Sequence, residues 1–196
     1  MADQKTIATY NATADNYVKL VSRTAPDQDL QRFIDAIPKH GLVLDWGCGP
    51  GNSAAMMQAA GLVAEVIDAS EKMVALARTK YGLNAKQATF DDLDEKARYG
   101  GLWANFSLLH APKSSMPTHL KAAHTALKAG GYFHIGMKLG TGEKRDKMAR
   151  MYTYYQEDEL IALIKNAGFT IDFTRTDAMK GMVGHEEPFI IITAHA

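Results

Sequence analysis

The stretch GLVLDWGCGPG, residues 41–51, is the part of the sequence that decides the fold. Its apolar start, residues 42–44, is typical of a short buried strand, and a glycine-rich turn follows directly. Glycine accepts positive φ angles and lets a ligand approach the main chain closely. Residues 52–60 then have helical character, so their first N–H groups and positive dipole end face the turn. The stretch predicts a strand–turn–helix unit with a ligand site above the strand.

The spacing of the glycines separates two classes of ligand. A dinucleotide-binding turn has the pattern G-x-G-x-x-G. Counted from Gly47 or Gly49, the last glycine of that pattern would fall on Asn52 or Ala54. The chain instead has D-x-G-x-G-x-G, with Asp45 two residues before the first glycine. A carboxylate at this place would repel a pyrophosphate but would pair with an ammonium group.

Together, Asp45, Gly47, Gly49 and Gly51 resemble the first motif of the class I S-adenosylmethionine (SAM)-dependent methyltransferases. The resemblance implies SAM as cofactor, S-adenosylhomocysteine as product, and transfer of a methyl group to an acceptor. It also implies that Asp45 and the amides of the glycine loop hold the amino-acid end of SAM. A glycine-rich turn that binds nothing is the alternative.

A second acid follows the next predicted strand, residues 62–67. In nucleotide-type folds, an acid at this place binds the ribose, because a carboxylate accepts two hydroxyl hydrogens at once. Ser70 already suits the N-cap of a helix over residues 71–80, so Asp68 is not needed for capping. We therefore expect Asp68 to bind the ribose. Ala69 and Met73 are expected to line the edge of the cofactor.

Phe90 and Asp91 follow a weak third strand, residues 84–89. They resemble the adenine pocket of the family, with the base packed on Phe90 and its amine bonded to Asp91. A solvated position for Asp91 is the alternative.

Residues 101–109 predict a central fourth strand that is buried on both faces, so its carboxyl end opens onto the same crevice. Asn105 is a polar residue in this apolar run, and it needs a partner if it is buried. The resemblance places Asn105 at the cofactor. The family usually has an acid just before this strand, whereas this chain has Gly100. His110, after the strand, is the best candidate for a general base or a substrate-orienting residue. A plain turn residue is the alternative.

Two further segments are expected to border the site. Residues 1–40 predict a helical cap, and the resemblance implies that Tyr10 and Tyr17 contact the cofactor; packing on the sheet edge is the alternative. Residues 139–155 form a long connection at the carboxyl edge of the sheet, which is usually functional, so we expect a lid. A solvated loop whose tyrosines pack on the core is the alternative. The expected substrate contacts are His110, Lys138, Arg145, Tyr152, Tyr154 and Tyr155.

The last two predicted strands, residues 169–178 and 188–194, are joined by only nine residues, 179–187. A parallel crossover needs about a dozen residues or more, so these strands are expected to form an antiparallel hairpin. The prediction is a three-layer α/β sandwich with a seven-stranded, mostly parallel sheet whose last strand is antiparallel. It is one domain over residues 1–196, with a Rossmann-like core over residues 41–196. This is the class I methyltransferase architecture.

The composition limits the classes of partner molecule that the protein is expected to bind. Lys plus Arg equals Asp plus Glu at 22 each, so the net charge does not favour nucleic acid, although a local basic patch is the alternative, and a small-molecule acceptor is expected. The single cysteine, Cys48, has no partner for an intrachain disulfide, and the start of the chain lacks a signal-peptide pattern. We expect a cytoplasmic protein without a membrane segment. No spacing of ligand residues predicts a metal, and nothing predicts the oligomeric state.

Two other functions are compatible with parts of the pattern. An NAD(P)-dependent oxidoreductase would share the strand–turn–helix unit and the ribose acid, but the glycine spacing, Asp45 and the terminal hairpin disfavour it. A SAM-binding module without catalysis would keep the cofactor residues and lack an acceptor pocket.

Overall fold

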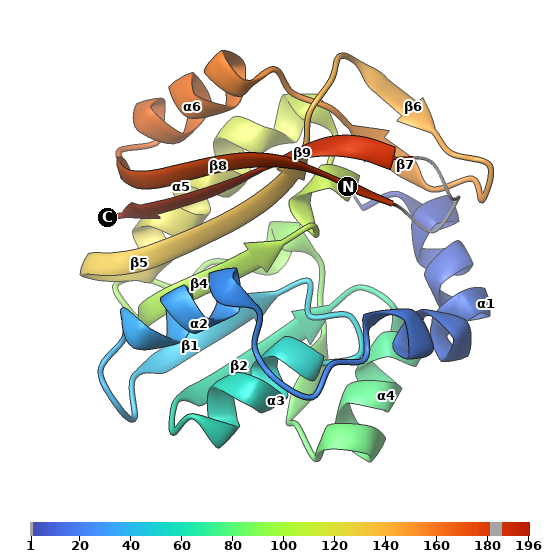
Figure 1. Cartoon of the computed structure of the whole chain (residues 1–196), viewed down its shortest axis with the longest axis horizontal. Coiled ribbons are helices and arrows are strands. Elements are labelled where there is room, and N and C mark those ends of the chain that lie inside the picture. Colours follow the sequence, from blue (N-terminus) through green and yellow to red (C-terminus); the bar gives the residue numbers. More distant parts are fainter. Residues whose placement is uncertain (1, 181–185) are drawn as a thin grey trace.

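A seven-stranded sheet between two layers of helices forms the centre of the computed structural model, which describes residues 2–180 and 186–196 (Figure 1). The strand order is β3-β2-β1-β4-β5-β9-β8. β9 runs antiparallel to both β5 and β8, and the other pairings are parallel. The strands are β1 (Leu42–Trp46), β2 (Val63–Asp68), β3 (Ala85–Gln87), β4 (Tyr99–Asn105), β5 (Leu127–Lys138), β8 (Thr170–Lys180) and β9 (Glu186–His195). The predicted fold class, including its reversed last strand, is confirmed.

The helices pack on the two faces of the sheet, and alternate side chains of each strand point to one helix layer or to the other. Val43 and Trp103 pack with α2 and α3 on one face, whereas Leu44 and Leu102 pack with α5 and α6 on the other. Because helices cover both faces of the sheet, consecutive residues of one strand are apolar whichever face their side chains point to. The helices of the layers are α2 (Gln28–Asp35), α3 (Asn52–Ala59), α4 (Glu71–Tyr81), α5 (Met116–Ala126) and α6 (Glu157–Asn166).

Two elements lie outside these layers, beyond the carboxyl ends of the parallel strands (Figure 1). The first is α1 (Gln4–Val21), and the second is a two-stranded sheet of β6 (Glu143–Arg145) and β7 (Met151–Thr153). They are bonded to each other: the Met151 N–H donates to Thr6 Oγ1 at 2.8 Å. None of the helices in the described residues has the length and apolar character that a bilayer-spanning segment requires.

The fourth strand is shorter than predicted and ends at Asn105 rather than at residue 109. Phe106 has a positive φ of 54°, which breaks the extended conformation. The Ser107 hydroxyl then donates to the Trp46 carbonyl at 2.6 Å and holds the turn against β1. Three short 3₁₀ helices border the site: η1 (Phe90–Asp92), η2 (Leu108–His110) and η3 (Lys113–Ser115).

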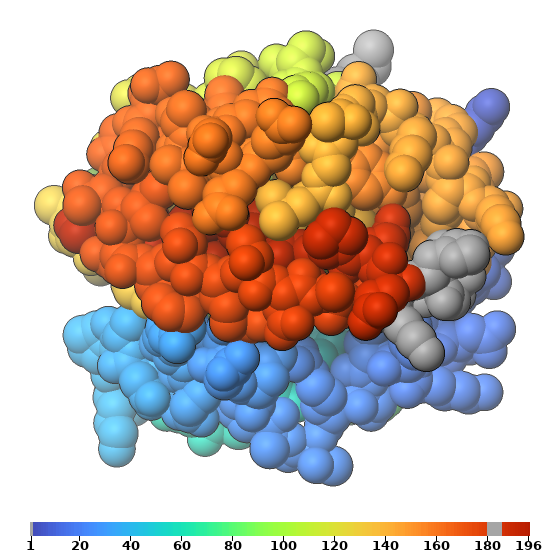
Figure 2. Space-filling view, turned by 45° about the horizontal axis from the view of Figure 1, so that its top comes forward, coloured from blue at the N-terminus to red at the C-terminus, as the bar shows by residue number. Residues whose placement is uncertain are grey.

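The terminal hairpin closes the sheet against the N-terminal helices. β8 and β9 pair antiparallel from Thr170–His195 to Lys180–Glu186, and part of their predicted link, residues 181–185, lies outside the described residues. In Figure 2 the red segment that includes β8 lies directly against the blue N-terminal helices. Arg175 on β8 forms an ion pair with Asp29 on α2 at 2.6 Å.

Two adjacent glycines provide a test of the packing between β4 and α2. A Cβ atom on Gly101 would lie 2.3 Å from Ile37 Cδ1 and 2.8 Å from Phe33 Cζ, whereas a Cβ on Gly100 would meet nothing closer than 3.6 Å. We expect Gly101→Ala to lower the free energy of unfolding by about 1–3 kcal/mol through overpacking. Gly100→Ala, the matched control, should change it by less than about 0.5 kcal/mol. Urea denaturation measures both, and equal values would contradict the close packing of α2 on β4.

Candidate active site

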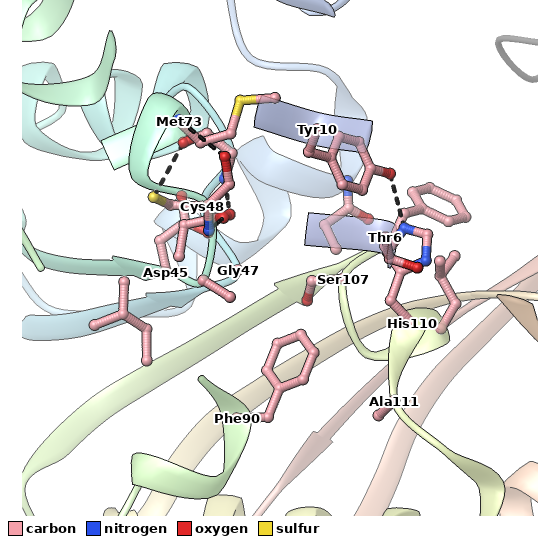
Figure 3. A pocket seen from close by; sticks show the side chains of 18 of the residues that line it. Thr6, Tyr10, Asp45, Gly47, Cys48, Met73, Phe90, Ser107, His110 and Ala111 are labelled. Carbon is pink, nitrogen blue, oxygen red and sulfur yellow. Dashed lines mark hydrogen bonds between the residues drawn. The ribbon is translucent and has the colours of Figure 1, made fainter. Parts of the chain in front are cut away.

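A cavity of about 510 Å³ lies at the carboxyl ends of β1, β2, β4 and β5, and residues of α1 form part of its wall (Figure 3). This volume is typical of small-ligand sites. Most of the predicted site residues line it: Tyr10, Tyr17, Asp45, Gly47, Gly49, Asp68, Ala69, Met73, Phe90, Asp91, Asn105, His110, Lys138 and Tyr152. Gly51, Arg145, Tyr154 and Tyr155 are not in its wall.

The three glycines of the loop do three different things. A Cβ on Gly47 would lie 2.4 Å from Ser107 Cβ, so this glycine allows the turn after β4 to come close. A Cβ on Gly51 would lie 2.5 Å from Leu83 Cδ1, so this glycine allows α3 to pack near α4. Beside Gly49 the nearest atom is Tyr17 Cε1 at 3.6 Å, which leaves the space over the loop open. Only Gly49 therefore keeps room for a ligand by its lack of a side chain.

The amides of the loop are already used, which corrects the expectation that they hold a ligand. The N–H groups of Gly47 and Cys48 both donate to the Ile67 carbonyl, at 3.0 and 2.9 Å. The Gly49 N–H donates to Asp68 Oδ2 at 2.8 Å. These bonds join the loop to β2, so the donors for a ligand at this place must come from elsewhere in the wall.

Asp45 is buried at the end of β1, with 2% of its surface exposed, and faces the α3 side of the sheet. Its Oδ2 atom has no hydrogen-bond partner among the described residues. Burial raises the pKa of Asp45 to about 8, and the negative charge of Asp68 adds to this effect. An unpaired buried carboxyl group is unfavourable unless a cation neutralises it. Asp45 is therefore prepared for a positively charged group.

Asp68 is held firmly at the end of β2. Its Oδ1 accepts from the Ser70 N–H at 2.8 Å, while Oδ2 accepts from the loop as described. Each carboxylate oxygen keeps a further lone pair on the cavity side, so both can accept a hydroxyl hydrogen. Burial raises the pKa of Asp68 above its usual range. The two acids are thus neighbours: Asp45 accepts from the Ala54 N–H but keeps its Oδ2 without a partner among the described residues, whereas Asp68 is oriented by two N–H donors.

Phe90 and Asp91 form another part of the wall together with residues that the sequence did not reveal. The Phe90 ring meets Trp46 edge-on, with centroids 5.5 Å apart, and His119 at 5.9 Å. His119 Nε2 lies 3.8 Å from Asp91 Oδ1. His119 comes from α5, far along the chain, and only the packing of that helix on the sheet brings it here.

His110 is enclosed between two polar partners at the other end of the cavity. Its Nδ1 lies 2.6 Å from the Met151 carbonyl, so Nδ1 carries the hydrogen and donates it. Its Nε2 lies 2.7 Å from the Tyr10 hydroxyl, which therefore donates to it (Figure 3). Burial lowers the pKa of His110 to about 4. The imidazole is thus neutral at pH 7, and both of its nitrogens are engaged, which does not suit a general base.

Two buried cations lie beside this pair, and each has an acidic partner. Arg150, with 2% of its surface exposed, is bonded to Asp146 at 2.6 Å and also donates to the Tyr10 hydroxyl at 3.3 Å. Lys138 forms an ion pair with Glu187, and its Nζ lies 3.9 Å from the centre of the Tyr152 ring. Because these charges are compensated, this end of the cavity is polar and aromatic rather than strongly cationic.

The predicted substrate residues outside the wall have other partners. Arg145 is exposed and makes two bonds with Asp3, the N-cap of α1, at 2.6 and 2.9 Å. The Tyr154 hydroxyl donates to Glu187 at 3.0 Å, and Tyr155 is fully buried in the core. The tyrosines at 154 and 155 therefore pack as core residues, as the alternative reading of this segment had it.

Sequence reasoning missed Arg150 and Ser107, which also line the cavity. For Arg150, the only signal was its spacing of four residues from Asp146. Ser107 lay inside what read as a strand. Their roles depend on contacts between distant parts of the chain.

The raised pKa of Asp45 has a consequence for stability. The folded protein holds this proton up to about pH 8, whereas the unfolded chain releases it near its ordinary value of 3.8. Stability is therefore lost as the pH rises through this window. We expect Asp45→Asn to gain about 1–3 kcal/mol relative to the natural chain between pH 6 and 8. Thermal denaturation without ligand, with Asp94→Asn as exposed control, measures this difference. A difference that does not change with pH would contradict the raised pKa.

Comparison with known proteins supports the resemblance. Residues 43–131 match a family model described as a methyltransferase domain. No curated protein sequence matches the chain significantly.

Solved structures share the fold over most of the chain. The structure of Burkholderia thailandensis 1,6-didemethyltoxoflavin-N1-methyltransferase, with bound 1,6-didemethyltoxoflavin and S-adenosylhomocysteine, has a TM-score of 0.79 at 21% identity and covers 97% of this chain and 87% of that one. A SAM-dependent methyltransferase from Methanosarcina mazei has a TM-score of 0.74 at 18% identity, covering 87% and 98%. One from Thermotoga maritima, named a possible histamine N-methyltransferase, has a TM-score of 0.69 at 19% identity, covering 96% and 98%.

The residues present fit the cofactor that this family uses. The buried, unpartnered Oδ2 of Asp45 suits the ammonium group of SAM, and the open space over Gly49 suits a ligand lying across the loop. The family match includes the strand–turn–helix unit, and the fold that extends over nearly the whole chain is that of solved SAM-dependent methyltransferases, so the chain is similar to the class I SAM-dependent methyltransferases in both respects.

Proposed function

We propose that the chain transfers the methyl group of SAM to a small, planar organic acceptor. The observation that carries the proposal is the lining of the cavity at the carboxyl ends of the strands. One end contains the two carboxyl groups, and the other contains the side chains of Tyr10, Phe106 and Tyr152. A structure with this fold and a bound small substrate supports it.

The cofactor would lie across the ends of β1 and β2. We propose that Asp45 neutralises its ammonium group and that Asp68 binds the ribose hydroxyls. Phe90 and Asp91 would hold the adenine. The walls between them are supplied by Gly47, Gly49, Ala69, Met73, Asn105 and Tyr17.

The acceptor would lie between α1 and the end of β5, against Tyr10, Lys138 and Tyr152. Bound SAM supplies an activated methyl group on a sulfonium that leaves readily. The chain therefore has to orient the acceptor in line with the methyl group and to exclude water. Flat aromatic walls orient a planar molecule by stacking and edge contacts.

We propose that Tyr10, and not His110, meets the acceptor. The neutral His110 takes the Tyr10 hydrogen, and Arg150 donates to the same hydroxyl oxygen, so the phenol is fixed in one orientation. Tyr152 is also within hydrogen-bonding reach of this hydroxyl, so the acceptor would meet the two tyrosines together. A base is needed only where the acceptor loses its proton before or during transfer, and an uncharged nitrogen does not require this.

We further propose a single domain over residues 1–196 in which residues 1–40 act as a cap and residues 139–155 as a lid. The ion pair between Asp3 and Arg145 joins these two segments. Thr9 adds a bond to the Met148 carbonyl at 2.8 Å, and Asn11 is bonded to Ser70 on the cofactor side. These bonds hold α1 over the cavity, to residues 139–155 on one side and to Ser70 on the other.

Removal of the ribose acid tests the cofactor assignment. We expect Asp68→Ala to weaken SAM binding by about 10- to 100-fold, because hydrogen bonds to a charged group contribute about 1.5–3 kcal/mol. Isothermal titration calorimetry measures the affinity. Asp94→Ala, which removes an exposed acid that does not line the cavity, is the matched control. Equal affinity of the Asp68 variant and the natural chain would refute the assignment.

The low pKa of His110 predicts the pH profile of the reaction. With an acceptor found by screening small aromatic amines, and at saturating SAM, the rate of S-adenosylhomocysteine release should stay flat from pH 6 to 7.5, because His110 remains neutral above its pKa of about 4. A rate that rises through pH 6–7 and loses this rise in His110→Asn would show instead that His110 is the general base.

A further inference from the structure

A buried histidine that no part of the proposed chemistry uses lies behind the cavity. His134 of β5 is fully buried and stands directly opposite Trp103 of β4. The two rings are stacked, with centroids 3.7 Å apart and planes inclined by 16°. Trp103 lines the cavity, whereas His134 does not.

His134 reaches the cavity through one bond. Its Nε2 lies 3.1 Å from Oδ1 of Asn105, which does line the cavity. Gly136 makes space for this oxygen, because a Cβ atom there would lie only 2.5 Å from it. The carbonyl side of the Asn105 amide is thus enclosed by β5. The Nδ2 amino group, on the other side of the amide, has no hydrogen bond within the described residues.

The charge and tautomer of His134 decide which way the Asn105 amide points. Burial lowers the pKa of His134 to about 3, and the positive charges of Arg32 and Arg175 act in the same direction. A neutral imidazole carries one hydrogen. If Nε2 carries it, Nε2 donates to Oδ1 and the buried Nδ1 is left with a bare lone pair. If Nδ1 carries the hydrogen instead, this buried N–H has no acceptor in the described part of the chain. Buried N–H donors without a partner are rarer in proteins than buried acceptors without a partner.

A second buried polar side chain lies across the strand from His134. Thr193 of β9 is paired directly opposite His134. Its hydroxyl group and His134 Nδ1 are both buried and both without a partner among the described residues.

Asn105 lies at the height of the amino-acid end of the proposed cofactor position. Trp103 pairs with Asp45 in the register of β4 and β1, which places Asn105 level with Gly47 and on the same face as Asp45. An amino acid needs a cationic or N–H partner for its carboxylate as well as an acid for its ammonium group. The amides of Gly47, Cys48 and Gly49 are already used.

We infer that His134 is a positioning residue: it donates to Oδ1 of Asn105 and so fixes the amide with its NH₂ group towards the cavity, where that group binds the carboxylate of SAM. The ligand part of this inference rests on the proposed function. The amide orientation does not, because it is a property of the free protein.

Nuclear magnetic resonance of the free, ¹⁵N-labelled protein tests the orientation. We expect His134 to be neutral, with the hydrogen on Nε2, from pH 5 to 8, and the side-chain NH₂ signals of Asn105 to change in His134→Leu. A hydrogen on Nδ1, or a charged ring, would overturn the inference whether or not SAM binds.

Calorimetry with SAM tests the coupling. Asn105→Ala should weaken SAM binding by about three- to tenfold, which is the range of one hydrogen bond. His134→Leu should have a similar effect, and His134→Gln, which keeps an N–H donor, should recover most of the affinity. In the Asn105→Ala background, His134→Leu should have no further effect.

Several results would separate this inference from the proposed function. Additive effects of the two substitutions, or unchanged affinity of Asn105→Ala, would overturn the coupling. Absence of SAM binding by the natural chain would refute the proposed function instead. Thermal denaturation shows whether His134→Leu is folded. If His134→Leu is not folded, the SAM affinity of His134→Gln is compared with that of Asn105→Ala. A His134→Gln variant that binds SAM as weakly as Asn105→Ala would overturn the positioning role of His134.

Discussion

The structure depends on one constraint: a parallel sheet covered on both faces leaves its carboxyl ends as the place where polar groups can gather. Asp45, Asp68 and Asn105 each stand at the end of their strand, and the pairing of β1 with β2 and β4 brings them together. Asp45 has no partner for its buried Oδ2. The fold thus carries an uncompensated acid that a cationic ligand can neutralise, at a cost to the stability of the free protein.

The glycine loop contributes less to binding than its composition suggests. Most of its N–H groups are bonded within the loop or to β2, and two of its glycines serve close packing. Its function is to orient Asp68 and to leave the space over Gly49 open. The proposed role of Asn105 and His134 is to supply one donor for the ligand from the neighbouring strand.

The other end of the cavity is built by segments that are distant in sequence. Tyr10 of α1, His110 after β4 and Arg150 before β7 form one hydrogen-bonded group. Each fixes the next, so that the phenol of Tyr10 is held in one orientation. The wall of the cavity at this end is therefore formed by the N-terminal helix as well as by the sheet.

Local pattern was enough to determine the fold class, the antiparallel hairpin and the positions of Asp45 and Asp68, because strand periodicity, loop length and glycine spacing act over short stretches of chain. The environment of His110 was decided only by tertiary structure, since its pKa of about 4 follows from burial under α1. The same holds for Gly51, which faces Leu83, and for His134, whose bond to Asn105 joins two strands. Burial and long-range pairing set these properties, and neither can be read from neighbouring residues.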